Sequence, residues 1–376
     1  MSRRGFRAAT GIGAVGLLTA GLTMGVLPVV AGAQVKPHAT KFLACMVTDV
    51  GGINDKSFNY SAYQGLLGAQ KVVGASHMGY DLVQTPPNGG VGYPKEISTL
   101  LSKHCGIIVT VGFLMDAATG AAASAHKSQR FAIVDDTPSS TSKELLSLTY
   151  ATNQDAFLGG ALSAAESKTH VVATYGGVKI PPVTIYMDGF VAGVRWYDKT
   201  YRKHVKVLGW IPQKPRNYKD GLYDGTGVFT NSFTDQSAGK ADTNTFFAEK
   251  ADIVFPVAGS VGLGSVAAAV SAGKGHYVDW VDTDGCISEP TDCKYFPMSV
   301  TKGITVSVRT AILAAYHNTF KGGVYLGTLK NNGATLVVDK KSISETASEK
   351  TMISNATKGI EKGTISVDPN TYPKTP

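Results

Sequence analysis

The sequence of 376 residues lacks several features that mark whole classes of protein. Only 17% of its residues are charged, and no arginine-rich run is interleaved with aromatic residues, which argues against nucleic-acid binding. The 43 glycines follow no G-x-y period and the prolines number only 16, so collagen-like and proline-rich chains are excluded. A single long uncharged stretch excludes a polytopic membrane protein. With 43% hydrophobic residues, the chain has enough apolar side chains for roughly two domains, each with its own core.

Common motifs for catalysis and for metal or cofactor binding are also absent. The sequence has no G-x-S-x-G nucleophile elbow and no H-E-x-x-H zinc motif. The four cysteines form no C-x-x-C pair and the eight histidines form no i, i+4 pair, so no metal site is predicted. The glycines around Gly259 are spaced G-x-x-G-x-G, which differs from the dinucleotide fingerprint, and no P-loop lysine follows them. The sequence therefore predicts a protein that is not an enzyme and carries no cofactor.

The first 33 residues have the composition of an export signal. Three arginines within the first seven residues form a charged start, residues 8–33 carry no charge, and the stretch ends in the A-x-A motif Ala31-Gly32-Ala33. The start is similar to a twin-arginine signal, and the alternatives are an ordinary secretion signal or an uncleaved anchor. Each of these predicts a folded part outside the cytoplasm. Without the three arginines the net charge falls from +8 to +5 (8 − 3), which predicts only weak attraction to anionic surfaces.

Four cysteines in an exported chain favour disulfides. Cys286 and Cys293 flank a short loop rich in turn-forming residues, which predicts that they pair with each other. Cys45 and Cys105 then either form a second disulfide or remain buried free thiols. Cys45 also follows a segment similar to a lipobox, but charged residues separate that segment from the apolar stretch, so Cys45 is interpreted as a strand residue.

Apolar runs alternate with amphipathic stretches along the rest of the chain. Strands are predicted at 41–48, 80–84, 106–111, 131–134, 170–175, 204–209, 253–257 and 276–282. Helices are predicted at 55–73, 94–103, 115–126, 155–167, 183–197, 238–250, 261–272 and 345–363. Strands that alternate with helices form βαβ units, so the predicted fold class is α/β, with two doubly wound parallel-sheet lobes and a ligand cleft between them. Residues 212–229 interrupt the alternation and are expected to form a surface insertion.

Polar or glycine-rich clusters follow several predicted strands, at the ends where α/β folds bind ligands. In chain order they contain Asp49, Asp55, Phe58 and Asn59, then Asp135 and Asp136, then Gly259, and finally Asp282, Asp284 and Lys302. Carboxylates accept hydrogen bonds from hydroxyl and ring N–H groups, and glycine lets the backbone approach a flat ligand. Taken singly, each residue also has a structural interpretation: Asp55 as a helix cap, Phe58 in a core, Asp282 and Lys302 as an ion pair.

Taken together, the clusters resemble the basic membrane protein (BMP) family, which are substrate-binding proteins of ABC transporters best known as purine nucleoside receptors. The opening run is Val47-Thr-Asp-Val-Gly-Gly-Ile-Asn-Asp-Lys-Ser-Phe-Asn59. Further matches keep the family order and lie at 154–160, 176–182, 188–193, 232–235, 251–259, 281–284, 299–303 and 327–333. The resemblance covers about residues 41–365 and implies a type I periplasmic-binding fold, with two lobes joined by three crossovers.

The resemblance also implies roles for individual residues. Phe58 is expected to stack on the base, Asp135 to contact the base, and Asp282 or Asp284 to hold the ribose together with Lys302. The rest of the expected ligand-binding site is Asp49, Asp55, Asn59 and Gly259.

The implied function is that of a monomeric, exported protein that binds a nucleoside, in particular a purine nucleoside. The protein would lie on the outer side of the cytoplasmic membrane or be secreted. It would deliver the nucleoside to an ABC permease without changing the nucleoside covalently. The alternatives are a surface sensor of nucleosides and a nucleoside-processing enzyme.

The expected domain boundaries follow from the same reasoning. Residues 1–33 form the signal peptide, and residues 34–150 with about 283–315 form the N-terminal lobe. Residues 151–282 with about 316–376 form the C-terminal lobe.

Overall fold

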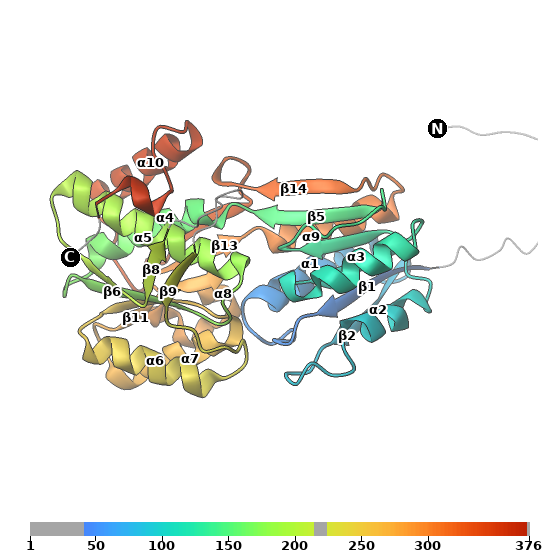
Figure 1. Ribbon diagram of the computed structural model, residues 1–376, viewed down its shortest axis with the longest axis horizontal. Helices are drawn as coiled ribbons and strands as arrows, with labels where there is room; N and C mark the ends of the chain where they lie inside the picture. The colour runs from blue at the N-terminus through green and yellow to red at the C-terminus, as the bar shows by residue number, and fades with distance from the viewer. Residues whose placement is uncertain (1–40, 214–223, 374–376) are drawn as a thin grey trace, which may run out of the picture. The chain divides into compact units, whose positions relative to one another are not determined.

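A computed structural model describes residues 41–213 and 224–373 of the chain. This part is an α/β structure whose two larger sheets are parallel and covered by helices on both faces (Figure 1). The fold class predicted from the alternation of strands and helices is therefore confirmed. The predicted export signal lies outside the described residues.

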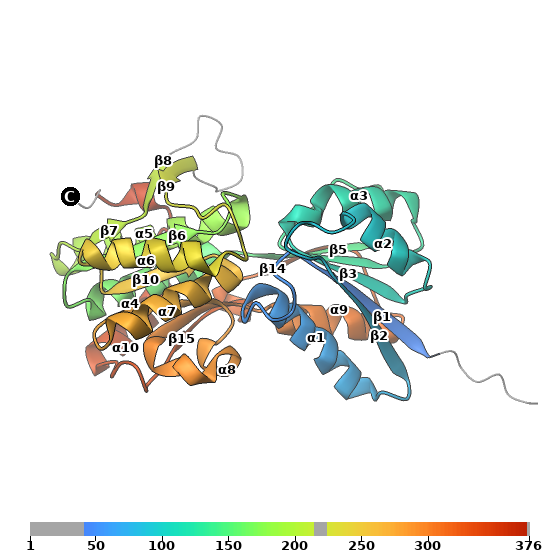
Figure 2. The same ribbon diagram turned by 90° about the horizontal axis from the view of Figure 1, so that it is seen from below.

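The first sheet has six parallel strands in the order β14-β5-β4-β3-β1-β2. The bounds are β1 Phe42–Thr48, β2 Met78–Gln84, β3 Ile107–Val111, β4 Phe131–Val134, β5 Leu145–Tyr150 and β14 Gly323–Gly327. One face is covered by α1 (Phe58–Val73) and α9 (Ile304–Tyr316), and the other by α2 (Tyr93–Leu101) and α3 (Asp116–Ala125), as Figure 2 shows. Because helices pack on both faces, every residue of β3 is buried, which explains its continuous apolar run.

The second sheet has four parallel strands in the order β11-β10-β6-β7. The bounds are β6 Val171–Gly176, β7 Lys206–Leu208, β10 Ile253–Val257 and β11 Tyr277–Val278. Its faces are covered by α4 (Thr152–Glu166) with α5 (Pro181–Tyr201) and by α6 (Gln236–Ala248) with α7 (Gly262–Ala272). Helices α4 and α5 approach closely, because a Cβ on Gly160 would lie 2.0 Å from the carbonyl oxygen of Phe190. Glycine at this position is therefore required by packing.

A third, three-stranded sheet contains β12 (Trp280–Asp282), β13 (Met298–Lys302) and β15 (Ala334–Val338). Strands β12 and β13 are parallel, and β13 and β15 are antiparallel. The chain passes three times between the first sheet and the remaining elements: from β5 to α4, from β13 to α9, and from β14 to β15. The last long helix is α10 (Ala347–Glu361).

The lobe boundaries remain a prediction. At two places a strand pairs in a sheet other than that of the lobe to which its residues are assigned. Strand β14 pairs with β5 in the first sheet, although residues 316–376 are expected in the second lobe. Strand β13 pairs with β12 and β15, although residues 283–315 are expected in the first lobe. Sequence patterns give the order of the elements but not the sheet that each strand joins, and this explains both differences.

Several elements also differ from the sequence-based assignment. The predicted helix at 55–73 begins only at Phe58, and the predicted strand at 276–282 is interrupted at Asp279. The residues assigned to a surface insertion begin and end in an antiparallel pair, β8 (Trp210–Gln213) and β9 (Asp224–Gly227). Strands β5, β13, β14 and β15 and helix α9 were not predicted. Short elements complete the described chain: α8 Gly285–Ser288 and the 3-10 turns η1 Phe113–Met115, η2 Gly259–Val261, η3 Pro290–Tyr295, η4 Leu329–Asn331 and η5 Pro369–Thr371.

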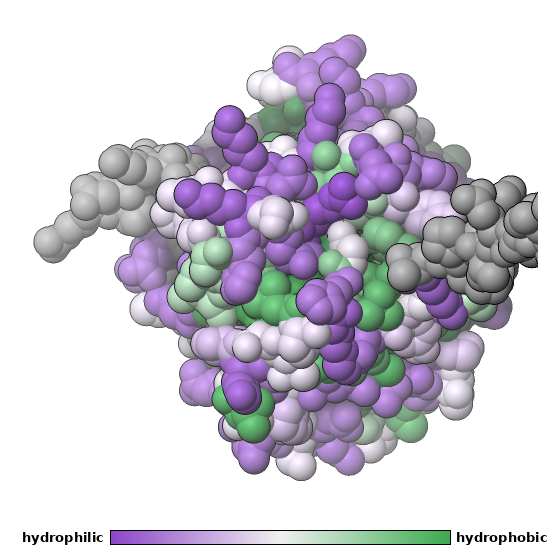
Figure 3. Space-filling view, turned by 90° about the vertical axis from the view of Figure 1, so that its right-hand side faces the viewer, coloured by the Kyte–Doolittle hydropathy of each residue, from purple (hydrophilic) through white to green (hydrophobic). Residues whose placement is uncertain are grey.

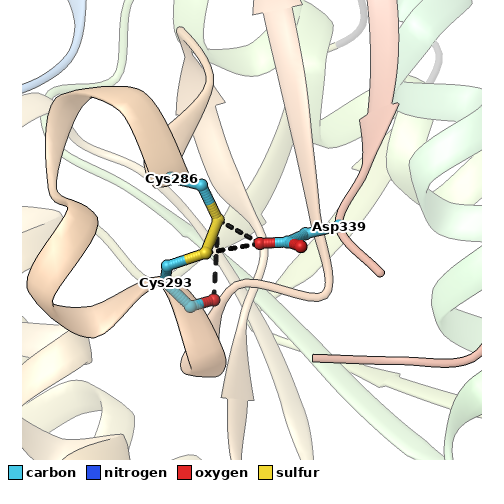
Figure 4. Close-up of side chains that lie close together, drawn as sticks. All are labelled: Cys286, Cys293 and Asp339. Atoms are coloured by element: carbon cyan, nitrogen blue, oxygen red, sulfur yellow. Dashed lines mark hydrogen bonds between the residues drawn. A yellow bond between two sulfur atoms is a disulfide. The ribbon is translucent and has the colours of Figure 1, made fainter. Parts of the chain in front are cut away.

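Two disulfides hold the described part of the chain together. One joins Cys45 of β1 to Cys105, just before the neighbouring strand β3, so Cys45 is a buried strand residue. The other joins Cys286 of α8 to Cys293 of η3 (Figure 4). The carboxylate of Asp339 contacts both of these sulfur atoms, with Oδ2 2.6 Å from Sγ of Cys293. Although the three side chains bring possible metal ligands within 4.8 Å of one another, sulfurs bonded to each other offer no thiolate, so we assign no metal site to them.

Hydrophilic side chains cover most of the face shown in Figure 3, and apolar ones are visible in smaller groups between them. The large apolar side chains are instead buried in clusters on both faces of the two larger sheets. None of the helices in the described part of the chain combines the length and the apolar composition that a membrane span requires.

Candidate functional site

The predicted ligand-binding residues gather around one pocket. All of them except Asp284 line it: Asp49, Asp55, Phe58, Asn59, Asp135, Gly259, Asp282 and Lys302. They come from ends of β1, β4, β10, β12 and β13 and from the first turn of α1. The carboxyl ends of parallel strands are where α/β folds place ligands, so the pocket lies where the chain pattern predicts one.

A buried ion-pair cluster forms the polar side of the pocket. Lys302 stands at the end of β13 and pairs with Asp135, and its Nζ lies 3.4 Å from Oδ1 of Asp282. The Lys302 side chain is only 4% exposed and the two carboxylates 8%. Its ammonium also lies 5.1 Å from the ring centroid of Phe58 and 4.8 Å from that of Tyr186, within range of a cation–π contact. Charges buried to this extent are costly unless they are paired, so Lys302 and the two carboxylates stabilise one another in the pocket.

Both acids of the cluster have an uncommon backbone conformation. Asp135 has φ 69° and Asp282 has φ 68°, in the left-handed region that residues with a Cβ rarely adopt. Each follows or ends a strand, and the turn of the backbone there directs the carboxylate toward Lys302. Aspartate tolerates this region better than most residues with a Cβ, so it can form the turn at both positions.

Burial and neighbouring charges act in opposite directions on the pKa values of Asp135 and Lys302. Burial raises the pKa of Asp135 above its usual value, and the neighbouring Lys302 opposes that shift. Burial would lower the pKa of Lys302, but Asp135 and Asp282 together raise it. The lysine therefore keeps its proton across the neutral range and presents an ammonium group to the pocket.

The loop after β1 is organised by Asp55. Its carboxylate accepts hydrogen bonds from the backbone N–H of Ser57, Asn59 and Tyr60, at 2.8–3.0 Å, and from the side-chain amide of Asn59. Asp55 thus satisfies the free N–H groups at the start of α1 from two residues before the N-cap position, which Ser57 occupies. Burial raises the pKa of Asp55 to about 6, against the effect of these donors.

Asp49 and Asn59 complete the same loop. The backbone N–H of Asp49 donates to Oδ1 of Asn59 at 3.0 Å, and Tyr93 donates its hydroxyl to Oδ1 of Asp49 at 2.8 Å. The polar atoms of Asp55, Asp49 and Asn59 are thus largely engaged with the protein. Their ligand contacts remain a prediction, while their role in shaping the loop follows from these bonds.

Asp284 is the predicted residue that the pocket does not include. It serves as the N-cap of α8, where Oδ1 accepts the backbone N–H of Cys286 at 2.9 Å. Of the two acids in the Val-Asp-Thr-Asp run, Asp282 therefore faces Lys302, whereas Asp284 begins the following helix. The sequence left both acids open because either one can end a strand.

Three aromatic residues that line the pocket, Phe113, Tyr186 and Phe233, are not among the residues predicted from the sequence. Phe233 lies in the Ser232–Asp235 match, and its carbonyl oxygen accepts the hydroxyl of Ser260 at 2.7 Å. Tyr186 lies on α5 and donates its hydroxyl to Oδ1 of Asp282 at 3.3 Å. The motif around Phe233 was an available signal, but an inward-facing tyrosine on an amphipathic helix has the pattern of an ordinary core residue.

At Gly259 the backbone conformation favours glycine, whereas the space around it would admit a side chain. Its φ is 56°, and a Cβ built there would lie 3.8 Å from its nearest neighbour, the carbonyl oxygen of Phe233. A side chain would fit, but it would strain the backbone in the left-handed region. The loop after β10 therefore favours glycine for its turn, and the predicted close approach of this backbone to a flat ligand stays a prediction.

The loop after β1 also contacts β12 directly. The hydroxyl of Ser57 lies 2.9 Å from Oδ2 of Asp282, and the indole N–H of Trp280 donates to the carbonyl oxygen of Lys56 at 3.0 Å. These bonds join the loop after β1, on the side of the first sheet, to β12, which carries Asp282.

A second cavity of about 600 Å³ adjoins the pocket and shares Phe113, Asp135 and Pro182 with it.

Comparison with known proteins decides the family. A family model described as "ABC transporter substrate-binding protein PnrA-like" matches residues 42–215 and 227–369. This chain belongs to the Bmp family. Members of the family are substrate-binding proteins of ABC transporters, and the resemblance read from the motifs is thereby confirmed.

Individual relatives agree with this assignment. A protein of Lactococcus lactis named "ABC transporter nucleoside-binding protein BmpA" is 28% identical over 342 residues, which are 87% of this chain and 89% of that protein. Basic membrane protein B of Borrelia garinii is 26% identical and covers 78% of this chain and 80% of its own length. The chain is thus similar to these two relatives along most of their length.

A solved structure agrees with the fold. The crystal structure of a solute-binding protein of an ABC transporter system from Aeropyrum pernix superposes with a TM-score of 0.67, at 20% identity, over 87% of this chain and 88% of that one. The fold is that of the type I periplasmic-binding proteins. As a substrate-binding protein of this family, the chain has a small-molecule ligand and a transporter permease as its partners.

Proposed function

We propose that this Bmp-family protein binds a purine nucleoside in the pocket around Lys302 and delivers it to an ABC permease without changing it covalently. The ligand class is supported by the name of the Lactococcus lactis relative, a nucleoside-binding protein. The single observation that carries the proposal is the arrangement of Lys302 with Asp135 and Asp282 beside the ring of Phe58. This arrangement combines an aromatic surface for a base with paired charges for hydroxyl groups.

The roles of the residues follow from their chemistry. Phe58 stacks on the purine, and Phe233, which lines the same pocket, adds a second aromatic surface. Asp135 accepts hydrogen bonds from the base, while Asp282 and Lys302 bind the two vicinal hydroxyls of the ribose. A carboxylate accepts from these hydroxyls and an ammonium donates to them, so the pair satisfies both functions of a diol. Asp49, Asp55 and Asn59 hold the loop that carries Phe58.

The pocket must widen for the ligand to enter. It encloses about 60 Å³, far less than the roughly 300–1,000 Å³ typical of small-molecule sites. We infer that the two predicted lobes move apart to admit the nucleoside and close again around it, with the three chain passages between the sheets as hinges. The bonds from the Lys56–Ser57 segment to β12 would break and re-form in this motion.

The proposed place of action is outside the cytoplasm. Residues 1–33 have the composition of an export signal, and a substrate-binding protein must meet its permease on the outer side of the membrane. We propose that the folded part acts there as a monomer. Because the ligand leaves unchanged, the proposal includes no catalytic step.

Isothermal titration calorimetry tests the ligand class. We expect purine nucleosides to bind with one-to-one stoichiometry, and free purine bases and ribose to bind at least tenfold more weakly. A site built for hydroxyl groups leaves its own polar groups unpaired when the ligand lacks them, which is the reason for this preference. Absence of binding by every nucleoside, together with binding of another class of solute, contradicts the proposed function.

A matched pair of lysine variants tests the role of the ion-pair cluster. Lys302→Met should abolish the preference for nucleoside over free base, since the diol loses its donor. Lys103→Met is the control, because Lys103 pairs with Asp81 but does not line the pocket. If Lys302→Met weakens base and nucleoside equally, or changes only the melting temperature, Lys302 is a structural residue and the ribose assignment is wrong.

A further inference from the structure

Both oxygens of the Asp282 carboxylate are contacted by donors of the protein itself. Oδ1 lies 3.3 Å from the hydroxyl of Tyr186 and 3.4 Å from Nζ of Lys302. Oδ2 lies 2.9 Å from the hydroxyl of Ser57. A carboxylate has about four acceptor sites, two on each oxygen, so these donors among the described residues leave one site open, on Oδ2.

The Tyr186 side chain is held in place by packing. It lies on α5, is fully buried, and its ring packs edge-on against that of Phe255, with the ring centroids 5.9 Å apart. Tyr186 also shares an apolar cluster with Val281, the residue before Asp282. We therefore expect the hydrogen bond from its hydroxyl to Oδ1 of Asp282 to persist when the pocket widens.

Ser57 approaches the same carboxylate from the loop after β1. Its hydroxyl lies within hydrogen-bond distance of two acceptors, Oδ2 of Asp282 and the carbonyl oxygen of Val281, the latter at 3.0 Å. Although Ser57 occupies the N-cap position of α1, its side chain makes no cap bond there. The hydroxyl of Ser57 therefore serves β12 and not the helix that it precedes.

Lys302 has a matching number of open donors. Its ammonium has three N–H groups and contacts two carboxylates, those of Asp135 and Asp282. The third N–H has no carboxylate partner in the described part of the chain. One hydroxyl of a vicinal diol can then donate to the open site of Asp282, while the other accepts from Lys302.

We propose that Tyr186 and Ser57 are positioning residues that orient the Asp282 carboxylate and leave it a single open acceptor site, so that Asp282 binds only one of the two ribose hydroxyls. Lys302 binds the other. This inference deepens the proposed function and rests on it, because it divides the ribose between two residues. A carboxylate that is held at both oxygens cannot turn freely, and this makes the site selective for the position of one hydroxyl.

Calorimetry with adenosine or guanosine, whichever binds more tightly, and with its 2′-deoxy and 3′-deoxy analogues tests this division. The dissociation constant of each analogue, divided by that of the parent nucleoside, measures what the missing hydroxyl contributes. For the wild type we expect both ratios to be about ten or more, because each hydroxyl bonds to a charged group.

Tyr186→Phe removes only the hydroxyl and keeps the ring. We expect it to lower one of the two ratios about threefold or more and to change the other less than about twofold, since only one ribose hydroxyl is coupled to Tyr186 through Asp282. Ser57→Ala removes the other bond to the carboxylate and should lower the same ratio. Tyr175→Phe is the matched control and should leave both ratios unchanged, because Tyr175 is another fully buried tyrosine, with its hydroxyl 2.7 Å from Oγ of Ser265, and does not line the pocket.

Two results overturn the inference while the proposed function stands. Tyr186→Phe lowers both ratios alike, which would show that Asp282 binds both hydroxyls, or it changes neither ratio, as it would if it weakened all three ligands equally through the fold. If the wild type binds no nucleoside, the proposed function fails and this inference fails with it.

Discussion

Phe58 shows how one residue serves both the fold and the site. It is the first residue of α1, packs on the core of the first sheet with its partly buried ring, and lines the pocket. Its position is fixed by the loop before it, where Asp55 binds the N–H groups of the first helical turn. These bonds therefore fix the backbone that carries Phe58 beside the pocket before any ligand arrives.

This role gives a prediction for Phe58→Leu. Leucine keeps most of the apolar volume that packs on the core, so the fold should persist, while stacking on the base is lost. A stacked aromatic pair contributes about 0.5–1.5 kcal/mol, so affinity for a purine nucleoside should fall roughly 2- to 13-fold. Calorimetry measures the change, and Phe247→Leu, which lies outside the pocket, is the control. Equal affinities of wild type and Phe58→Leu would refute the stacking role.

At the scale of residues, the sequence predicts which side chains belong to the site better than it predicts which of them contact each other. Strand ends and motifs pointed to Asp135, Asp282 and Lys302, and the pocket brings all three together. The direct pairing of Lys302 with Asp135, 167 positions away in the chain, depends on how the sheets are arranged.

At the scale of elements, the break between β11 and β12 has an identifiable cause. Asp279 separates the two strands, is fully buried, and accepts the hydroxyl of Ser163 on α4 at 2.6 Å. Its other oxygen has no hydrogen-bond partner in the described part of the chain. Burial raises the pKa of Asp279 to about 8. The sequence pattern at 276–282 therefore predicts one strand. In the structure, Asp279 bonds to α4 and separates β11 from β12.

This anchor predicts how stability depends on pH. The folded state keeps a proton on Asp279 up to about pH 8, whereas the unfolded chain loses it near the ordinary aspartate pKa of 3.8. Between these values the folded state binds more protons, so its free energy of unfolding falls as pH rises, by at most about 1.4 kcal/mol per pH unit. Asp279→Asn removes this dependence and should lose less stability than the wild type between pH 5 and pH 8. Urea unfolding at both pH values measures it, with the exposed Glu361→Gln as control; identical pH dependence in wild type and Asp279→Asn contradicts the prediction.

The two disulfides differ in the length of chain that they close. Cys45 and Cys105 are 60 positions apart and Cys286 and Cys293 only 7. By loop-closure entropy, the longer loop stabilises the fold by about 4 kcal/mol and the shorter by about 2.5 kcal/mol. Replacing both cysteines of a pair by alanine should therefore lower the free energy of unfolding more for Cys45/Cys105 than for Cys286/Cys293. Urea unfolding of the two double variants checks this order, and the reverse order would show that local effects around the two loops outweigh chain entropy.

At the scale of the whole molecule, alternation of strands and helices predicted the α/β class because this pattern is local and repeats. Strands β14 and β15 were not predicted, since both follow α9 without the helix between them that the pattern requires. Their pairing with β5 and with β13 is long-range, and it produces the third passage between the sheets. The sequence implied three crossovers only through its resemblance to a family, and no periodicity in the chain reveals where they lie.

Competitive binding followed by native mass spectrometry tests the central claim most directly. The protein is incubated with an equimolar mixture of purine and pyrimidine nucleosides, free bases, monosaccharides and amino acids, and the mass of the bound solute is read from the intact complex. A buried site with an aromatic surface and a paired lysine predicts one bound molecule with the mass of a purine nucleoside. A bound sugar, amino acid or free base, or a spectrum without any bound nucleoside, would contradict the proposed function.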